Sequence, residues 1–367
     1  MNKTMIAATA AALSAGSVQA GGFERSVLPL GFMFETGNYA ELSFGSVSPK
    51  VSGTLGTASS GNVTKNYTTL GLAVKADLTD KLSLGLTIDP TFGADVSYEA
   101  GTEYPLRGSS AKLRGETIAL IAKYKINENV SVLGGLRSVG IGGNISLSTT
   151  SLPGANGAPV NFYNASFGHT RDIGYVVGAA YEKPEIALRV ALTYASKTNH
   201  DLPVSGNALT DSGPVVLSGT TPVELPQSLT LDFQSGVAPD TLVFGSIRWM
   251  DWTSTTLIAP NAGAANPLVS YSHDTITYNL GVGRRFSDAF SGAVSVGYEK
   301  HHGDSVGNLG PSDGQISLQI GGTYTHQNMK ITAGVRYADV GNATTRSGGR
   351  FTDNSAVAVG MKVGFNF

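Results

Sequence analysis

The chain has 367 residues, of which only 14% are charged, and its formal net charge is −2. This near balance of charges gives no sign of nucleic-acid binding, which normally requires a strongly basic surface. The chain contains no cysteine, so disulfides are excluded as a support for its fold.

Residues 1–20 have the three parts of an export signal. A basic residue at Lys3 precedes an apolar stretch from Met5 to Leu13, and Val18-Gln19-Ala20 suits cleavage by signal peptidase. No later run reaches the ~18 uninterrupted apolar residues that a membrane-spanning helix needs. We therefore expect an exported protein without a helical anchor, whose mature chain starts at Gly21.

Residues 21–37 form a segment that is too apolar for an exposed tail and is interrupted by glycines and Pro29. We predict that it enters a barrel as a plug, or hatch. A disordered leader or an early strand is the alternative. The candidate plug residues are Phe23, Leu28, Pro29, Phe32, Met33 and Phe34.

Residues 38–367 repeat an alternation of period two, in which apolar side chains face one way and small or polar ones the other. Six short turns alternate with seven long connections, a pattern typical of periplasmic turns and extracellular loops. The pattern predicts an all-β fold, a transmembrane antiparallel β-barrel of 14 strands that occupies residues 38–367. The expected strands are 38–50, 67–78, 82–92, 112–126, 130–142, 170–182, 186–196, 227–235, 241–252, 269–286, 290–300, 315–325, 329–338 and 354–367.

Charged residues within these strands should face the lumen, because a cation on the lipid face at mid-depth costs ~2–4 kcal/mol. An inward arginine is a candidate partner for a ligand carboxylate. The alternative is that the arginines pair with acidic residues across the interior and only fill it. The candidates are Arg137, Arg189, Arg248 and Arg336.

Two long connections, residues 143–169 and 197–226, contain many apolar side chains for segments expected outside the membrane. Exposed apolar residues suggest a binding surface, although the loops could instead pack on one another. We predict that these loops capture a hydrophobic ligand. The candidates are Phe162, Tyr163, Phe167, Leu202, Val204 and Leu209.

The strand expected at 82–92 runs directly into a proline. Proline cannot donate to a strand ladder, and a closed barrel has no edge strand to hold it. Pro90 therefore marks either the extracellular end of this strand or a local break in the wall. The candidate residues for such an opening are Asp89, Pro90, Phe92 and Gly93.

The sequence resembles the FadL/TodX family of outer-membrane transporters for long-chain fatty acids and hydrocarbons. The resemblance spans essentially the whole mature chain and is most specific at residues 89–94, 174–184, 248–252 and 278–283. It implies a fourteen-stranded barrel with an N-terminal hatch, a ligand captured between long loops, and a sideways exit at a kink in the third strand. One departure is that the N-terminal segment is short and lacks the family's Asn-Pro-Ala motif.

We therefore expect a passive transporter in the outer membrane of a Gram-negative bacterium. Its partners would be a hydrophobic small molecule, outer-membrane lipids and lipopolysaccharide, and it would act as a monomer. The sequence indicates no catalytic residue, cofactor, metal site or nucleic-acid partner, so we do not expect an enzyme. A diffusion porin and a structural or adhesive surface barrel are the alternatives.

Overall fold

The computed structural model describes residues 22–152, 156–258, 260 and 267–367. The expected signal peptide, residues 1–20, and Gly21 lie outside the described residues. Within these ranges no helix is long and apolar enough to cross a membrane. The helical structure in them consists of short 3-10 turns, η1 (Gly31–Phe34), η2 (Pro184–Ile186) and η3 (Trp252–Ser254).

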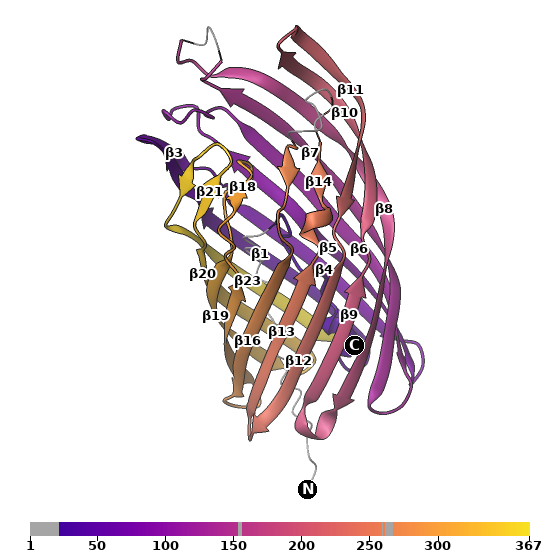
Figure 1. Ribbon diagram of the computed structural model, residues 1–367. Coiled ribbons are helices and arrows are strands. Elements are labelled where there is room, and N and C mark those ends of the chain that lie inside the picture. The colour runs from indigo at the N-terminus through magenta and orange to yellow at the C-terminus, as the bar shows by residue number, and fades with distance from the viewer. Residues whose placement is uncertain (1–21, 153–155, 259, 261–266) are drawn as a thin grey trace.

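Fourteen antiparallel strands form the wall of a closed barrel, as the alternation predicted (Figure 1). Strands β1 and β23 join the two ends of the chain in an unbroken register from Tyr39↔Asn366 to Lys50↔Ser355. Closure leaves no open edge in the membrane. The wall strands are β1 (Tyr39–Lys50), β4 (Tyr67–Asp77), β5 (Leu82–Ser97), β6 (Ser110–Lys125), β7 (Val130–Thr149), β8 (Val160–Lys183), β9 (Leu188–Ala195), β12 (Ser228–Ala238), β13 (Thr241–Met250), β16 (Thr275–Arg285), β17 (Phe290–Glu299), β19 (Gln315–His326), β20 (Met329–Val340) and β23 (Asn354–Asn366).

The two faces of the wall have opposite character. On the outside, Leu70 and Leu280 are 63% and 57% exposed, whereas Lys75 on the inside is 3% exposed. Large apolar side chains that would be unfavourable in water are what a lipid-facing surface requires. Aromatic side chains also lie on the outer face, as is typical of the membrane interfaces of such barrels: Tyr124, Tyr175, Tyr181, Tyr278, Tyr298, Tyr324, Tyr337 and Phe367 are all exposed.

The segments expected as long loops are partly ordered sheet, which corrects the prediction. Residues 143–169 largely continue β7 and β8 beyond the wall, and residues 197–226 form the hairpin of β10 (Thr198–Thr210) and β11 (Gly213–Leu225). β10 pairs with the upper part of β8, so the hairpin extends the wall outward (Figure 1). The hairpin escaped prediction because its glycines, prolines and polar residues resemble loop composition.

Two small sheets lie at the end of the barrel that carries the β10–β11 hairpin (Figure 1). A five-stranded sheet combines pieces of three connections, and a two-stranded sheet lies within a fourth. The strand expected at 269–286 is therefore interrupted, since β16 begins only at Thr275. The additional strands are β2 (Ser52–Leu55), β3 (Ala58–Asn62), β18 (Ser305–Val306), β21 (Ala343–Thr345) and β22 (Arg350–Phe351) in one sheet, and β14 (Thr256–Leu257) and β15 (Val269–Ser270) in the other.

Residues 22–38, here called the N-terminal segment, lie inside the barrel. Phe32 and Met33 are 2% and 0% exposed and pack against small inward side chains of the wall. Gly85 makes room for them, because a Cβ at that position would lie 2.3 Å from the Met33 sulfur. The segment therefore belongs to the interior core and is not an external leader.

We expect Leu280→Arg to lower the free energy of unfolding by about 2–4 kcal/mol, because it places a cation on the lipid face near the middle of β16. Asn279→Arg is the matched control, since Asn279 lines the lumen. Denaturant titration in lipid vesicles measures both. Equal losses for the two variants would contradict the assignment of the faces.

Candidate functional site

The hydrogen-bonded ladder of the wall is interrupted between β4 and β5. The two strands pair from Asp77↔Ser83 to Leu72↔Ile88, and the chain that precedes β4 meets β5 again at the bridge Thr64↔Val96. On the other side of β5, the register with β6 shifts by a bulge between Asp89 and Phe92. Residues 66–71 and 89–94 thus border a gap in the ladder, which we call the window.

Pro90 contributes to this irregularity, because its nitrogen has no hydrogen to donate to a neighbouring strand. Asp89 and Phe92 are buried, at 6% and 2% exposure, so this part of β5 turns inward instead of ending above the membrane. The sequence left two possibilities for Pro90, a strand end or a break. β5 continues to Ser97, so the proline lies within the strand.

The N-terminal segment supplies the hydrogen bonds that β4 does not. Gly93 N donates to Phe23 O at 2.8 Å, and Arg25 N donates to Thr91 O at 2.7 Å. The Arg25 guanidinium lies 4.2 Å from the centre of the Tyr67 ring, across the window on β4. Gly93 permits this approach, since a Cβ there would lie 2.6 Å from Arg25 Nε. The window is thus lined from within by the N-terminal segment.

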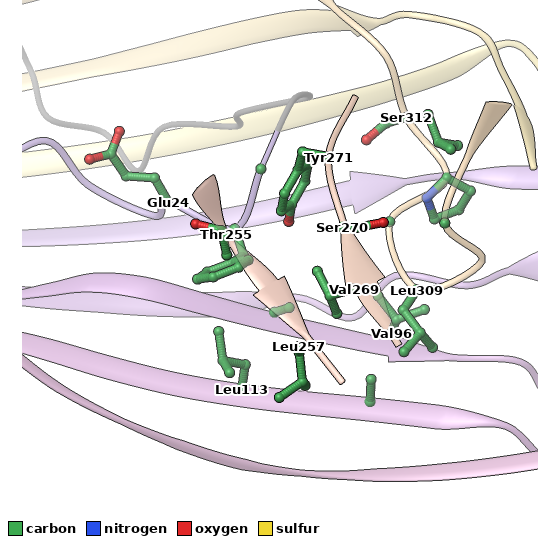
Figure 2. A pocket seen from close by; sticks show the side chains of 18 of the residues that line it. Glu24, Val96, Leu113, Thr255, Leu257, Val269, Ser270, Tyr271, Leu309 and Ser312 are labelled. Atoms are coloured by element: carbon green, nitrogen blue, oxygen red, sulfur yellow. The ribbon is translucent and has the colours of Figure 1, made fainter. Parts of the chain in front are cut away.

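A mainly apolar cavity of about 280 Å³ opens toward the long connections, and we call it the upper cavity. It is bounded by wall strands, the β10–β11 hairpin and the connections that precede β16 and β19. Figure 2 shows Leu113, Leu257, Val269 and Tyr271 around it, with Glu24 at one edge. Its lining also includes Tyr67, Gly93 and Val96, so the cavity reaches the window.

An aromatic cluster closes the cavity below. The Phe23 ring lies 4.9 Å from that of Trp252, which in turn lies 5.0 Å from that of Tyr271. Trp252 is fully buried. Burial also raises the pKa of the Tyr271 phenol, which therefore stays neutral. Sequence reasoning missed Trp252 and Tyr271 because it placed both in strands of the wall.

The outer rim of the cavity is polar. His273 stacks on His302 with 4.2 Å between ring centres and contacts the Asp304 carboxylate. Burial, followed by the neighbouring His273, lowers the pKa of His302. These groups give the cavity a hydrated mouth above an apolar interior.

A second cavity, of about 330 Å³, lies on the other side of the N-terminal segment, and we call it the lower cavity. All four candidate arginines line it. Arg189 donates to Gln234 at 3.1 Å and lies over the Phe34 ring, and the guanidinium of Arg137 donates to Ser196 O. Arg248 has an acidic partner that lies outside the wall strands.

That partner is Glu24 of the N-terminal segment. Arg248 Nη2 donates to Glu24 Oε1 at 2.7 Å, and Arg248 Nε to Oε2 at 3.3 Å, while the two side chains are 10% and 1% exposed. Arg248 also donates to Thr230 Oγ1 at 2.7 Å. Glu24 lines both cavities, so this ion pair lies at the boundary between them.

The candidate capture residues divide into three groups. Phe167 and Leu202 line the upper cavity. Tyr163 and Val204 are buried in the adjoining core, and Phe162 packs against it. Leu209 is 44% exposed near the end of β10, on the opposite face of the hairpin from the cavity lining, because alternate side chains of a strand face opposite ways; its capture role stays a prediction.

The candidate plug residues also lie at different levels. Phe23 lines the upper cavity, whereas Met33 is wholly buried below it. The other four line the lower cavity: Leu28, Pro29, Phe32 and Phe34.

Residues 35–362 match the model of the family described as outer membrane protein transport protein (OMPP1/FadL/TodX). This chain belongs to that family. The FadL/TodX family membership places the barrel in the outer membrane, as the sequence predicted. No curated protein sequence matches the chain closely enough to count as a relative.

Solved structures of FadL/TodX proteins share the fold. A Pseudomonas aeruginosa FadL homologue is 14% identical with a TM-score of 0.72, over 92% of both chains. The Pseudomonas putida toluene transporter TodX is 14% identical with a TM-score of 0.67, over 96% of both chains. The Ralstonia pickettii toluene transporter TbuX is 16% identical with a TM-score of 0.65, over 96% of this chain and 97% of its own. At such identities the likeness is one of architecture.

We expect Trp252→Ala to loosen the N-terminal segment, because a buried tryptophan typically contributes about 3–5 kcal/mol and here packs on Phe23. Hydrogen exchange at the Arg25 and Gly93 amides should become faster, since both bond across this contact. Trp249→Ala is the control, because Trp249 instead bonds Asp274. Unchanged exchange in Trp252→Ala would contradict the role of the cluster.

Proposed function

We propose that this protein is a passive channel for hydrophobic molecules, with long-chain fatty acids or related hydrocarbons as the ligand class. The observation that carries the proposal is that the apolar upper cavity extends to the window in the wall. Burial of each CH₂ contributes about 0.8 kcal/mol, so capture from water needs no energy source. TodX and TbuX, which share the fold, are toluene transporters, and this agrees with such a ligand.

The route we propose begins at the polar mouth and passes through the upper cavity. Phe167 and Leu202 contact the ligand there, while Tyr163, Phe162 and Val204 support them from the adjoining core. Leu209, exposed near the end of β10, remains a proposed capture residue at the outer surface of the hairpin. The apolar lining favours binding of hydrophobic ligands in general and does not select one of them.

Exit is proposed to occur sideways through the window, at Asp89, Pro90, Phe92 and Gly93. Leu70 and Ile88, which border the window, are 63% and 39% exposed on the lipid-facing side. An apolar ligand that leaves there enters lipid directly and avoids the periplasmic water. The N-terminal segment acts as the plug in this proposal, since its residues 23–25 cover the window from inside.

The proposal includes the division of the chain into an export signal at 1–20, a plug at 21–37 and a barrel at 38–367. We propose that the protein works as a monomer, because one chain closes its own barrel. Outer-membrane lipids and lipopolysaccharide are its proposed surroundings. The N-terminal segment inside the lumen, with Phe32 and Met33 buried against the wall, argues against an open diffusion pore.

Deletion of the gene should reduce uptake of a radiolabelled long-chain fatty acid or of toluene by intact cells, and a plasmid copy should restore it. The physical reason is that the polar outer leaflet resists apolar solutes. Uptake of a small sugar serves as the control. Unchanged hydrophobic uptake with reduced sugar uptake would instead indicate a porin.

Pro90→Val should slow hydrophobic uptake several-fold, because valine restores a backbone N–H that can pair within the wall and so narrow the window. Pro222→Val is the matched control: Pro222 lies within strand β11, paired with Asp201 of β10, and its side chain is exposed. Equal uptake by wild type and Pro90→Val at equal expression would remove the sideways exit from the proposal.

A further inference from the structure

We propose that Asp89 and Thr117 form a polar site behind the window, and that this site binds the hydroxyl group of an amphiphile such as a long-chain alcohol or a phenol. The inference rests on the proposed function and deepens it, because it names the ligand chemistry that the exit favours. An ionised carboxylate is disfavoured at the same place.

Several buried oxygens next to the window have no hydrogen-bond partner among the described residues. Asp89 Oδ1 and Thr117 Oγ1 are two of them, although their side chains are only 6% and 0% exposed. Thr87 Oγ1 on β5 and Ser26 Oγ on the N-terminal segment are two more, at 1% and 4% exposure. Burial of such a group without a hydrogen bond is unfavourable, and native proteins contain few of them. The protein therefore has free hydrogen-bonding capacity here.

These oxygens lie on adjoining elements. Asp89 of β5 and Thr117 of β6 are directly opposite each other in the strand register, and the Cβ atoms of such a pair typically lie about 4.5–5.5 Å apart. Thr87 faces the same way two residues earlier on β5. Ser26 approaches from the lumen, since its N–H donates to Thr91 O at 3.3 Å. The unpaired oxygens thus gather where the N-terminal segment meets β5 and β6.

No ion pair neutralises Asp89 within the described part of the chain. The Arg25 guanidinium, the cation of the window, lies over the Tyr67 ring instead. The groups that act on Asp89 electrostatically are two further carboxylates, Glu24 and Glu41, each of which is already held in its own ion pair. An unpaired ionisable group at membrane depth is unfavourable for stability and typically marks a functional site.

The site lies on the proposed exit route. Asp89 forms one border of the window, and its Oδ2 lies over Gly71 on the other border, where a Cβ would come within 2.9 Å of it. The missing side chain of Gly71 thus gives the carboxylate room at the gap. Toward the lipid, the same gap is bordered by the exposed side chains of Leu70 and Ile88. A ligand that moves from the upper cavity to the lipid meets one polar point between two apolar zones.

A hydroxyl group matches this site better than the other ends that a hydrophobic ligand can carry. It can donate its hydrogen to Asp89 Oδ1 and accept one from Thr117 Oγ1, so both unpaired groups are satisfied at once. A hydrocarbon satisfies neither of them. An ionised carboxylate has no hydrogen to donate and is repelled by Asp89. The window thereby favours alcohols and phenols over carboxylates.

Three radiolabelled ligands of equal chain length test the inference: dodecanol, dodecane and dodecanoate. Uptake by cells that carry each variant is measured at mildly alkaline pH, where carboxyl groups are ionised, and the uptake of the deletion strain is subtracted. Thr117→Val is nearly isosteric but removes the hydroxyl group. Dodecanol uptake should fall about three- to tenfold, the scale of one hydrogen bond, and dodecane uptake should stay unchanged.

Thr332→Val is the matched control for this variant, because Thr332 is also buried and faces inward but lines the lower cavity. Equal losses of dodecanol and dodecane uptake in Thr117→Val would overturn the inference. Unchanged dodecanol uptake would overturn it too, and would leave water as the only occupant of the site.

A second variant tests the charge of the site. Asp89→Asn removes the charge but keeps an acceptor oxygen, so dodecanoate uptake should rise about fivefold or more, while dodecanol uptake stays within about twofold of wild type. Asp232→Asn is the control, since Asp232 is an inward acid of β12 that lines the lower cavity. Unchanged dodecanoate uptake in Asp89→Asn, or the same rise in both variants, would contradict the proposed site.

The same measurements separate this inference from the proposed function. If the wild type takes up all three ligands no faster than the deletion strain, the proposed function is wrong. If uptake depends on the protein but Thr117→Val and Asp89→Asn leave the preference among the ligands unchanged, only the polar site is wrong.

Discussion

The structure depends on one constraint, which is that every backbone N–H and C=O in a lipid-embedded wall needs a partner within the protein. The barrel meets it by joining β1 to β23 and every strand to two neighbours. Where β4 and β5 separate, the constraint still holds, and the N-terminal segment supplies the missing partners to Thr91 and Gly93. Wall and plug are therefore parts of a single hydrogen-bonding arrangement.

This arrangement links the opening of the wall to the position of the plug. A segment that only filled the lumen could move without consequence for the wall. Here the same residues that bond β5 also separate the upper cavity from the lower one, and Glu24 fastens them to β13. Any change that moves residues 23–25 alters the seal between the cavities and the inner lining of the window together.

The interior has two kinds of surface, one in each cavity. The upper cavity is largely apolar and suits capture of a greasy molecule, whereas the lower one is lined by arginines. Phe34 lies within 4.6 Å of the cations of both Lys123 and Arg189, so the plug contacts this cationic surface through aromatic and charged groups alike. The chemistry that a ligand meets thus changes from apolar to cationic at the level of Glu24.

Much of the wall followed from the sequence, because a strand between lipid and lumen imposes period two on each residue locally. Leu70 outward and Lys75 inward were readable from neighbouring residues alone. The location of the N-terminal segment inside the barrel was also predictable, since an apolar segment interrupted by Pro29 suits neither a tail nor a wall strand. The hairpin at 198–225 was not, because extended strands outside the membrane carry no lipid-facing pattern.

The sequence by itself thus determined the fold class, the strand count and the faces, all of which rest on local periodicity. Only the tertiary structure decided what the N-terminal segment bonds and where the wall opens. Glu24 and Arg248 are 224 residues apart, and Phe23 meets Trp252 across a similar interval. Contacts of this kind depend on how the closed barrel brings distant strands around one lumen, and no local pattern encodes that.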